Sequence, residues 1–340
     1  MNTIKSYKEN KGRAISTGNK FKYVMAITIN PLNHKEGILR CIVSRKGDIT
    51  KHGSVDRSKL FFVKGKSLQS FSIGNVLIIK NEEKEIKKLN KKYLDFIGLE
   101  DPDIFYDKEK KLFHLYFTMA YIKKPKPHQI HLGHAEGKNL HSLVMTKPVL
   151  TSKAPKYASA KEVSIAPINS KGIRYNLFES SQKHGETYFS TVRVAIAHDL
   201  GKPWKYSKVV LDPYLSKNKW IGGHASPGPL LPKTFIDLGP NLMLGIMNGC
   251  EKNKIVKGVN VHGGHFTVGL FIYDYEHGEI KWVSKKPFLI DSEAKRITFA
   301  SQFIETKSGE GLLYAHVDDS FVRTYTLKAD LIKAILPRSF

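Results

Sequence analysis

The stretch Asp101-Pro102-Asp103-Ile104-Phe105, followed by the apolar run Leu112–Thr118, contains the pattern that decides the fold. The pattern is an X-Pro step, an apolar segment, a turn and a second apolar strand. It recurs at intervals of roughly 60–70 residues, the scale of one large propeller blade. The other X-Pro steps are Asn30-Pro31, Ala166-Pro167 and Gly228-Pro229, and a related step without proline is Ser301-Gln302-Phe303. The chain therefore repeats one structural unit five times.

Each unit supplies further short strands, and these decide between the all-β architectures. Runs of about four to eight β-branched and aromatic residues, separated by Gly, Pro, Asn and Asp, are typical of sandwiches, barrels and propellers. Three units close with similar segments, at Lys147–Leu150, Lys208–Leu211 and Lys286–Leu289. Five units of four strands predict an all-β, five-bladed β-propeller rather than a β-sandwich, because radial repetition leaves few open sheet edges.

The repeat predicts a single domain over residues 1–340 with two helices. Residues 1–21 are polar and basic, and we expect them to form a loosely ordered N-terminal extension. Asn81–Tyr93 has the close-spaced opposite charges of an exposed helix, and Lys328–Leu336 predicts a short C-terminal helix. The inner strand of each blade lines the axis, so polar residues near the X-Pro steps should converge on one funnel.

The charge balance is the unusual feature of the composition. The 340 residues include 55 Lys and Arg against 31 Asp and Glu, a formal net charge of +24. Such an excess either covers a solvated surface with lysine or concentrates an anionic partner, such as phosphate or an acidic glycan. No helix-turn-helix, RNP or zinc-finger pattern is present, so we expect no nucleic-acid partner.

Other features point to the cytoplasm. No apolar run reaches the ~18 residues of a membrane span, and the N-terminus lacks the apolar segment of a signal peptide. The two cysteines, Cys41 and Cys250, lie far apart in apolar contexts, which indicates a reducing compartment rather than a disulfide framework or a zinc site. We therefore expect a cytoplasmic protein without a metal centre.

Three carboxylates, Glu100, Asp101 and Asp103, surround Pro102 just before a strand. Proline biases the preceding residue to an extended conformation and so directs the Asp101 carboxylate. Clustered carboxylates raise one another's pKa, as a general acid at neutral pH requires. The same residues also occur in a simple Asp-Pro turn, so local composition alone leaves both interpretations open.

Gly98–Tyr121 resembles the second-blade signature of the β-mannoside phosphorylases and β-mannosidases, glycoside hydrolase family 130. That signature reads Glu-Asp-Pro-Arg, a turn and an aromatic strand ending in Thr. The resemblance covers residues 22–336 as short motifs in the family's order. They are Asn30-Pro31 with Leu39-Arg40, Lys161-Glu162 with Ile165-Ala166-Pro167, Gly222–Pro229, Phe266–Leu289 and Asp319-Ser320. It implies an enzyme that cleaves a β-mannoside of an oligosaccharide with inversion, using water or phosphate and no other cofactor.

The resemblance also implies roles for individual residues. Asp101 matches the proton donor, Lys161 a cation that holds phosphate, and Asp319 a residue that grips the sugar. Glu162 and Glu179 are the candidates for orienting or activating the nucleophile. The remaining candidates for binding substrate or phosphate are Asn30, Arg45, Glu100, Asp103 and His224.

Three departures from the family pattern bear on the choice between water and phosphate. Asp103 replaces the arginine after Glu-Asp-Pro, Met247 replaces a histidine that helps to hold phosphate, and Glu179 ends a strand that often ends in His-Arg. Fewer cations weaken an anion site, and an added carboxylate supplies a base for water. The departures favour hydrolysis. Three arginines would favour phosphate if they turned inward: Arg40, Arg45 and Arg174.

Two other classes of function remain open. One is a non-catalytic propeller that binds an acidic glycan or another anion. The other is a hydrolase of the five-bladed arabinanase and xylosidase type, whose second blade also carries an Asp-Pro step. That class needs an aspartate near the start of the first blade, where this chain has Asn30. The sequence identifies neither the sugar nor its linkage, and it leaves a homo-oligomer open.

Overall fold

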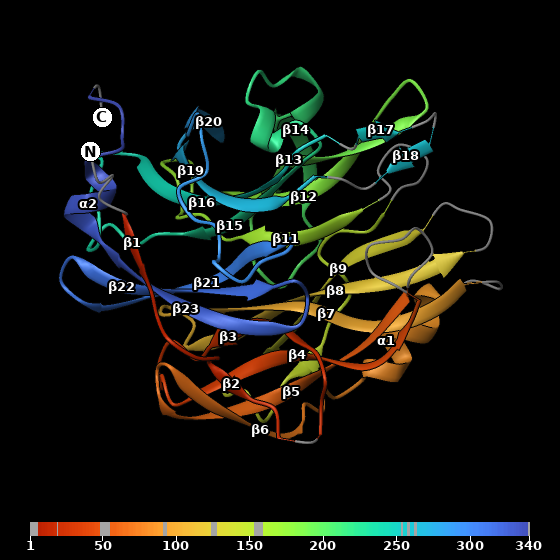
Figure 1. Cartoon of the computed structure of the whole chain (residues 1–340). Coiled ribbons are helices and arrows are strands. Elements are labelled where there is room, and N and C mark those ends of the chain that lie inside the picture. Colours follow the sequence, from red (N-terminus) through yellow and green to blue (C-terminus); the bar gives the residue numbers. More distant parts are fainter. Residues whose placement is uncertain are drawn as a thin grey trace.

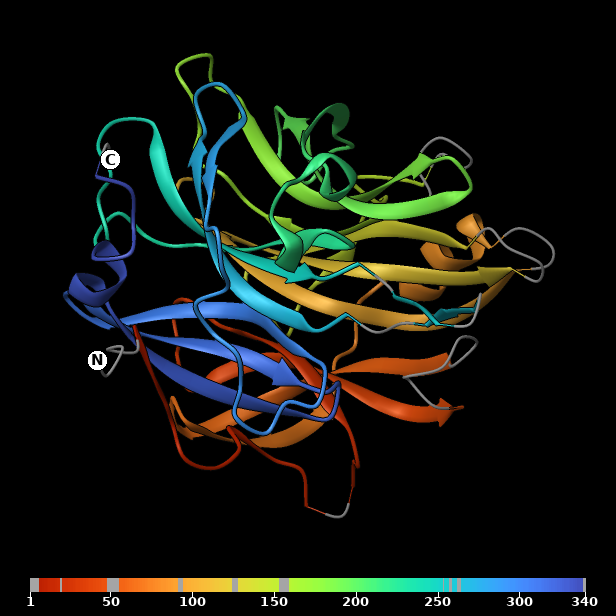
Figure 2. The ribbon, with the colours of Figure 1, turned by 45° about the horizontal axis from the view of Figure 1, so that its top comes forward.

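The computed structural model describes residues 6–18, 20–47, 55–90, 94–123, 128–152, 159–252, 254–256, 259–261 and 264–338. The chain is a β-propeller in which five antiparallel, four-stranded blades surround one axis (Figures 1 and 2). This confirms the all-β architecture that the repeat predicts. Among the described residues, no helix is long and apolar enough to cross a membrane.

In blades 1 to 4 the strands follow the chain from the inner to the outer edge, whereas the outer strand of blade 5 comes from the N-terminus. Blade 1 contains β3 (Val24–Ile29), β4 (Glu36–Lys46), β5 (Val55–Ser67) and β6 (Ser70–Val76). Blade 2 contains β7 (Leu94–Asp107), β8 (Leu112–Lys123), β9 (Gln129–Gly137) and β10 (Val144–Met145). Blade 3 contains β11 (Ala160–Ser164), β12 (Arg174–His184), β13 (Thr187–Ala197) and β14 (Lys205–Leu211). Blade 4 contains β15 (His224–Leu230), β16 (Leu242–Cys250), β19 (Phe266–Asp274) and β20 (Glu279–Val283). Blade 5 contains β21 (Thr298–Lys307), β22 (Glu310–Val317), β23 (Phe321–Lys328) and β1 (Tyr7–Glu9).

Short elements lie between or beside the blade strands. They are β2 (Ile15–Ser16), the hairpin of β17 (Lys254–Val256) and β18 (Val259–Val261), the helices α1 (Glu82–Leu89) and α2 (Ala329–Lys333), and the 3₁₀ turns η1 (Pro213–Leu215) and η2 (Lys219–Ile221). The two α-helices lie within the ranges predicted from the sequence. In α1, ion pairs three and four residues apart join Lys88 to Glu85 and Lys87 to Glu83, as its charge pattern predicts.

The hydrophobic core is divided into clusters that lie between neighbouring blades. One cluster packs blade 1 against blade 2, and equivalent clusters fill the seams between blades 2 and 3, 3 and 4, 4 and 5, and 5 and 1. Strands such as β3 and β19 thus have two buried faces, which explains their near-continuous apolar sequences, whereas outer strands such as β14 and β20 are partly exposed. The seams between the blades are apolar, and polar side chains of the inner strands, such as Asp101 and Glu162, line the axial cavity instead.

The inner strand of every blade carries a β-bulge. The ladder between each inner strand and the next strand shifts register once in blades 1, 3 and 4 and twice in blades 2 and 5. The extra residues at one shift in each blade are Ala26, Asp101-Pro102, Glu162, Gly228-Pro229 and Ser301. All of them line an axial cavity of about 450 Å³. A bulge bends the strand and redirects a side chain. The bulge is therefore the structural repeat, and the X-Pro step coincides with it only in blades 2 and 4.

The N-terminal segment closes the ring, in contrast to the loose extension expected for residues 1–21. β1 pairs with β23 of blade 5 (Figure 1), and the Asn10 and Ala14 amides continue this edge by bonding to the carbonyls of Thr324 and Val322. β2 then pairs with β6 of blade 1. Ala14 and Ile15 are buried in the seam between blades 5 and 1. The described part of this segment therefore joins the last blade to the first.

Candidate active site

Asp101 and Glu162 occupy equivalent bulges on the inner strands of adjacent blades. Both have a left-handed backbone, with φ of 47° and 49°. This conformation is uncommon for a residue with a side chain and stores strain. The two carboxyl groups are joined by a side-chain hydrogen bond. The fold thus uses two strained positions to place two acidic groups in contact.

A hydrogen bond between two carboxyl groups requires a proton on one of them. Arg40 Nη1 donates to Asp101 Oδ1 at 2.8 Å, whereas no ion pair to Glu162 is formed by the described residues. Burial opposes the ionisation of Asp101, but the charges of Arg40 and Lys161 outweigh it and lower its pKa. Burial and the charge of Asp101 raise the pKa of Glu162 well above its ordinary value. The opposite pKa shifts of the two groups therefore favour the proton on Glu162, whereas the sequence resemblance implies Asp101 as the proton donor.

Arg40 is the centre of this network. Its Nη2 donates to Glu100 Oε1 at 2.6 Å and its Nε to Ser58 Oγ at 2.9 Å. Burial raises the pKa of Glu100 to about 7, against the opposing charge of Arg40. One guanidinium thus serves two carboxylates, while a third carboxyl group lies next to them. This excess of acid over base keeps a proton in the site at neutral pH.

Glu179 forms a second group on the blade 3 side. Its carboxylate lies 3.1 Å from His224 Nε2 and 3.5 Å from Lys161 Nζ. Burial would raise the pKa of Glu179, but His224 and Lys161 lower it to about 2. Glu179 is therefore ionised at neutral pH, and the lysine and the histidine predicted to hold phosphate both contact it.

Asp319 forms a third group at the turn between β22 and β23. It has a φ of 48°, and its carboxylate Oδ1 lies 3.2 Å from His316 Nε2. Arg45 Nη2 donates to the Asp319 carbonyl at 3.2 Å, while its side chain pairs with Asp56 at 2.6 Å. Burial opposes the ionisation of Asp319, and the hydrogen bond and charge of His316 lower its pKa overall. The charges of Arg40 and Arg45 also act on Asp319, which links it to the acidic pair.

Sequence analysis missed His316, Phe299 and Ser58. The His316 ring is 5% exposed and stacks on Phe299, with centroids 5.1 Å apart and planes at 10°. His316 lies near the end of β22, three residues before Asp319 in the following turn, and this spacing is the one sequence signal that would have identified it. Ser58 lies within a strand and has no such signal.

Two of the predicted residues lie apart from these groups. Asn30 caps the turn between β3 and β4, where its side chain donates to Glu36 and accepts from the Leu32 amide. The equivalent of Asp101 in blade 1 is Ala26, four residues earlier. Asp103 takes no part in the hydrogen bonds of Arg40, but it lines the same axial cavity as Asp101 and Glu162, and burial raises its pKa to about 7.

The three arginines that would favour phosphate are all engaged. Arg40 turns inward but binds two carboxylates, and Arg45 is paired with Asp56. Arg174 lines the axial cavity, where it donates to the Ala166 carbonyl and lies over the Phe105 ring. Met247, at the position of the usual histidine, is fully buried in the seam between blades 3 and 4.

One group outside the site has the composition of a metal centre: His114, His134 and Glu136. The two facing ring nitrogens are 2.9 Å apart, which is a hydrogen-bond distance. Two nitrogens bound tetrahedrally at about 2.0–2.1 Å from zinc lie farther apart, at about 3.3 Å. His134 Nδ1 bonds to Thr146 Oγ1, which fixes the ring. Binding a metal through His114 Nδ1 would also leave a buried Nε2–H without a partner, so these residues fit a hydrogen-bonded pair better than a metal site.

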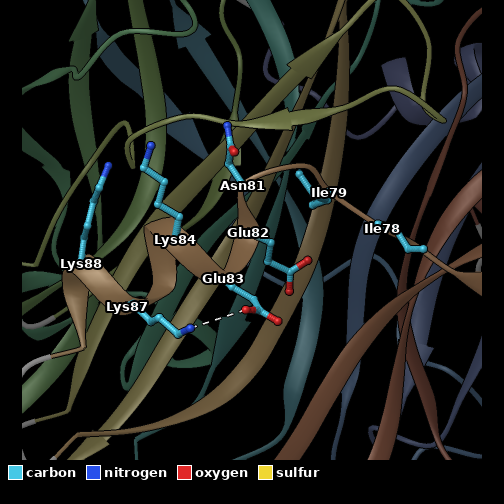
Figure 3. Close-up of a pocket in the computed structure, with 8 residues that line it drawn as sticks. All are labelled: Ile78, Ile79, Asn81, Glu82, Glu83, Lys84, Lys87 and Lys88. Atoms are coloured by element: carbon cyan, nitrogen blue, oxygen red, sulfur yellow. Dashed lines mark ion pairs between the residues drawn. The ribbon is translucent and has the colours of Figure 1, made fainter.

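A larger hollow, of about 920 Å³, lies beside α1 (Figure 3). It is lined by Ile78, Ile79 and charged side chains of the helix, among them Lys84 and Lys88. Figure 3 shows the ion pair of Lys87 with Glu83, whose atoms are 3.6 Å apart and largely exposed. The hollow contains no buried charged group comparable to the Asp101–Glu162 pair.

No protein-family model and no curated protein matches this sequence. Solved structures match the fold across nearly the whole chain. One belongs to the GH130 family of mannoside phosphorylases, which contains glycoside hydrolases that target β-1,2-mannosidic linkages in Candida mannan. It is 16% identical, with a TM-score of 0.66, and the match covers 95% of this chain and 94% of that one.

Two phosphorylases match in the same way. The β-1,2-mannobiose phosphorylase from Listeria innocua, in complex with β-1,2-mannobiose, is 12% identical with a TM-score of 0.65, over 98% of this chain and 99% of that one. A mannose phosphorylase from Leishmania mexicana, in complex with a phosphate ion, is 13% identical with a TM-score of 0.56, over 97% and 92%. The chain therefore shares the fold of glycoside hydrolases and phosphorylases.

Proposed function

We propose that this protein is an inverting glycoside hydrolase that cleaves β-mannosides in the cytoplasm. The observation that carries the proposal is the Asp101–Glu162 pair, in which two buried carboxyl groups at equivalent strained bulges share one proton. A group that retains a proton at neutral pH is what glycosidic-bond cleavage requires from its acid. The free, buried thiols of Cys41 and Cys250 agree with a reducing compartment.

The proton of the pair protonates the leaving oxygen. As the bond between the anomeric carbon and that oxygen breaks, the proton of Glu162 passes to the oxygen, directly or through Asp101. Arg40 stabilises the negative charge that remains on Asp101. Water attacks the opposite face of the anomeric carbon and gives up a proton to Glu179. Atoms and charges balance when the proton on Glu179 returns to the acidic pair through solvent.

Charge favours water over phosphate as the nucleophile. Lys161 and His224 both contact the ionised carboxylate of Glu179. A phosphate there would have to approach this carboxylate at close range, and like charges in a buried site repel strongly. A water molecule has no such penalty and needs a nearby base, which Glu179 supplies. The scheme uses no cofactor.

The sugar is proposed from the sequence resemblance and from the shared fold. The residues left to hold it are Asp319, positioned by His316, together with His224. The arabinanase and xylosidase type needs an aspartate in the first blade, and the equivalent bulge there holds Ala26. A β-mannoside is therefore the substrate to test first.

The test is incubation with a panel of β-linked mannosides, with and without phosphate, measuring free mannose and mannose 1-phosphate. We expect free mannose at the same rate in both conditions, released as the α-anomer when followed by NMR. Asp101→Asn and Glu162→Gln should each lower turnover by roughly a hundredfold or more, the scale of a lost general acid. Mannose 1-phosphate formed only when phosphate is present would refute the hydrolytic proposal.

A further inference from the structure

A compact group of aromatic rings lies outside the acidic site, at the tip of the β12–β13 hairpin and on η1. The rings of His184 and Tyr214 stack, with centroids 4.2 Å apart and planes at 12°. Phe189 packs edge-on against both, at 5.8 Å from His184 and 5.4 Å from Tyr214. We refer to His184, Phe189 and Tyr214 as the Tyr214 plate.

The plate is rigidly held. Asp212 Oδ2 lies 2.7 Å from His184 Nε2, and Asp212 Oδ1 accepts from the Tyr214 amide at 3.0 Å. One carboxylate thus fixes both stacked residues. A ring that is already fixed loses little conformational entropy when a ligand packs on it.

The plate lies next to the catalytic groups. Ser190 of β13 pairs with His224 of β15, and His224 contacts Glu179. Paired strands are about 4.8 Å apart, and Phe189 is the next residue, about 3.8 Å along the chain. The Cα of Phe189 therefore lies within about 9 Å of the Cα of His224. A ligand that extends out of the site beside His224 would meet these rings.

The plate is also unusually exposed for an aromatic group. Among the described residues, Tyr214 and Tyr188 are the most exposed of all Phe, Tyr and Trp side chains, at 48% and 44%. The next residue, Leu215, is 73% exposed. Lys252 extends over the Tyr214 ring, with Nζ 5.6 Å from its centroid. The plate thus combines an apolar ring with an ammonium donor, which suits the C–H face and the hydroxyl groups of a sugar.

We propose that the Tyr214 plate binds a distal sugar of an oligosaccharide whose cleaved linkage lies at the Asp101–Glu162 pair. The substrate is then an oligosaccharide longer than a disaccharide, and the plate supplies affinity without taking part in the chemistry. This inference rests on the proposed function, since it assumes a carbohydrate in the site. It assigns Tyr214 to the ring face of the sugar and Lys252 to its hydroxyl groups.

The experiment compares linear β-mannooligosaccharides of two to six units in the wild type, in Tyr214→Ala and in Tyr188→Ala. Tyr188 is the matched control, because it is similarly exposed on the neighbouring β12–β13 hairpin but contacts no ring of the described residues. Tyr214→Ala should leave kcat/KM for the disaccharide within twofold and lower it about fivefold to tenfold for the hexasaccharide, the scale of one aromatic contact. Tyr188→Ala should change neither value.

Calorimetry separates this inference from the proposed function. In the Asp101→Asn background, Tyr214→Ala should weaken hexasaccharide binding by the same factor. If Tyr214→Ala weakens binding of the disaccharide and the hexasaccharide equally, or if Tyr188→Ala weakens hexasaccharide binding as much, the proposed role of the Tyr214 plate is wrong. Neither result would contradict the proposed hydrolysis. If the wild type neither binds nor cleaves any of the oligosaccharides, the proposed function and the inference are both wrong.

Discussion

Two buried arginines of the described residues, Arg40 and Arg323, each contact several carboxylates, and the two clusters differ in how those carboxylates are held. Arg323 on β23 contacts Glu9 of β1, Asp291 and Glu293. Those carboxylates have further donors: Ser292 donates to Glu9, and the Tyr325 hydroxyl donates to Asp291. Burial would raise the pKa of Glu9, but the Ser292 hydrogen bonds and the charge of Arg323 lower it. Every charge in this cluster has a partner.

The cluster around Arg40 is not balanced in this way. Glu100 and Asp101 share one guanidinium, Glu162 holds a proton, and Asp101 and Glu162 have strained backbones. Arg323 joins the N-terminal strand to the last blade, so it stabilises the closed ring. The difference shows that a buried ion pair alone does not mark a functional site. Both clusters hold more carboxylates than cations. The Arg40 cluster differs because the pKa values of Glu100 and Glu162 are raised and because Asp101 and Glu162 have strained backbones, and neither feature improves stability.

The largest expected effect is on catalysis. Glu162→Gln removes the proton while retaining the size of the side chain, so kcat should fall by roughly a hundredfold to ten-thousandfold. The melting temperature should change little or rise, because an amide carries no charge to bury. Circular dichroism thermal scans alongside the kinetics check both parts. Full activity in this variant would remove Glu162 from the mechanism.

Arg323→Met tests whether the Arg323 cluster contributes to stability rather than to catalysis. It leaves Glu9 and Asp291 without their cation, and breaking such a buried pair costs about 3–5 kcal/mol of unfolding free energy. Urea titration measures the loss, and kcat of the folded enzyme should stay near the wild-type value. Arg323→Lys is the control and should lose less. A catalytic defect as large as that of Glu162→Gln would erase the distinction between the clusters.

A pH-dependent effect is expected at Asp103. Its pKa is about 7 in the folded chain, raised by burial from an ordinary value of 3.8. The folded state therefore holds a proton that the unfolded state releases, so this group lowers stability as pH rises from about 4 to 7, and the full penalty remains above 7. Asp103→Asn should be more stable than the wild type by on the order of 2 kcal/mol at pH 8. The gain should disappear near pH 4 in denaturant titrations, and a gain that does not depend on pH would refute the assignment.

The smallest effect concerns His316, which we expect to position Asp319. His316→Gln keeps a donor near Asp319, whereas His316→Phe keeps only the stacking on Phe299. We expect KM for a β-mannoside to rise about tenfold in the Phe variant and less in the Gln variant, with kcat nearly unchanged. His114→Gln is a matched control, because His114 is also a buried histidine with one unpartnered nitrogen. An equal rise in KM for the control would show that the effect is only structural.

The fold could be predicted from the sequence because each repeat consists of apolar strands and turns, which local sequence patterns indicate. The sequence also identified Asp101, Glu162, Glu179 and Asp319 as site residues, which lie in connected groups in the structure. It misplaced Asn30, because the X-Pro step in blade 1 falls in a turn rather than at the bulge. Bulges depend on pairing between strands, which a single strand does not reveal.

The sequence also did not indicate which charged residues contact one another in the site. Arg40 lies about 60 residues from the carboxylates that it binds, and His316 lies far from Asp101 along the chain. The position of the proton depends on these long-range partners, so the sequence alone does not decide which member of the pair holds it. The ring closure by residues 7–9 was missed for the same reason, because their partner strand is at the other end of the chain.

The central claim is that Glu162 is the member of the Asp101–Glu162 pair that holds the proton at neutral pH. Infrared spectroscopy at pH 7 tests it directly, through the C=O stretching band of a protonated carboxyl group. The measurement uses the Glu100→Gln/Asp103→Asn background, because Glu100 and Asp103 have pKa values of about 7 and would contribute to the band. We predict the band in this background and its loss when Glu162→Gln is added. A band that persists after this addition would contradict the account.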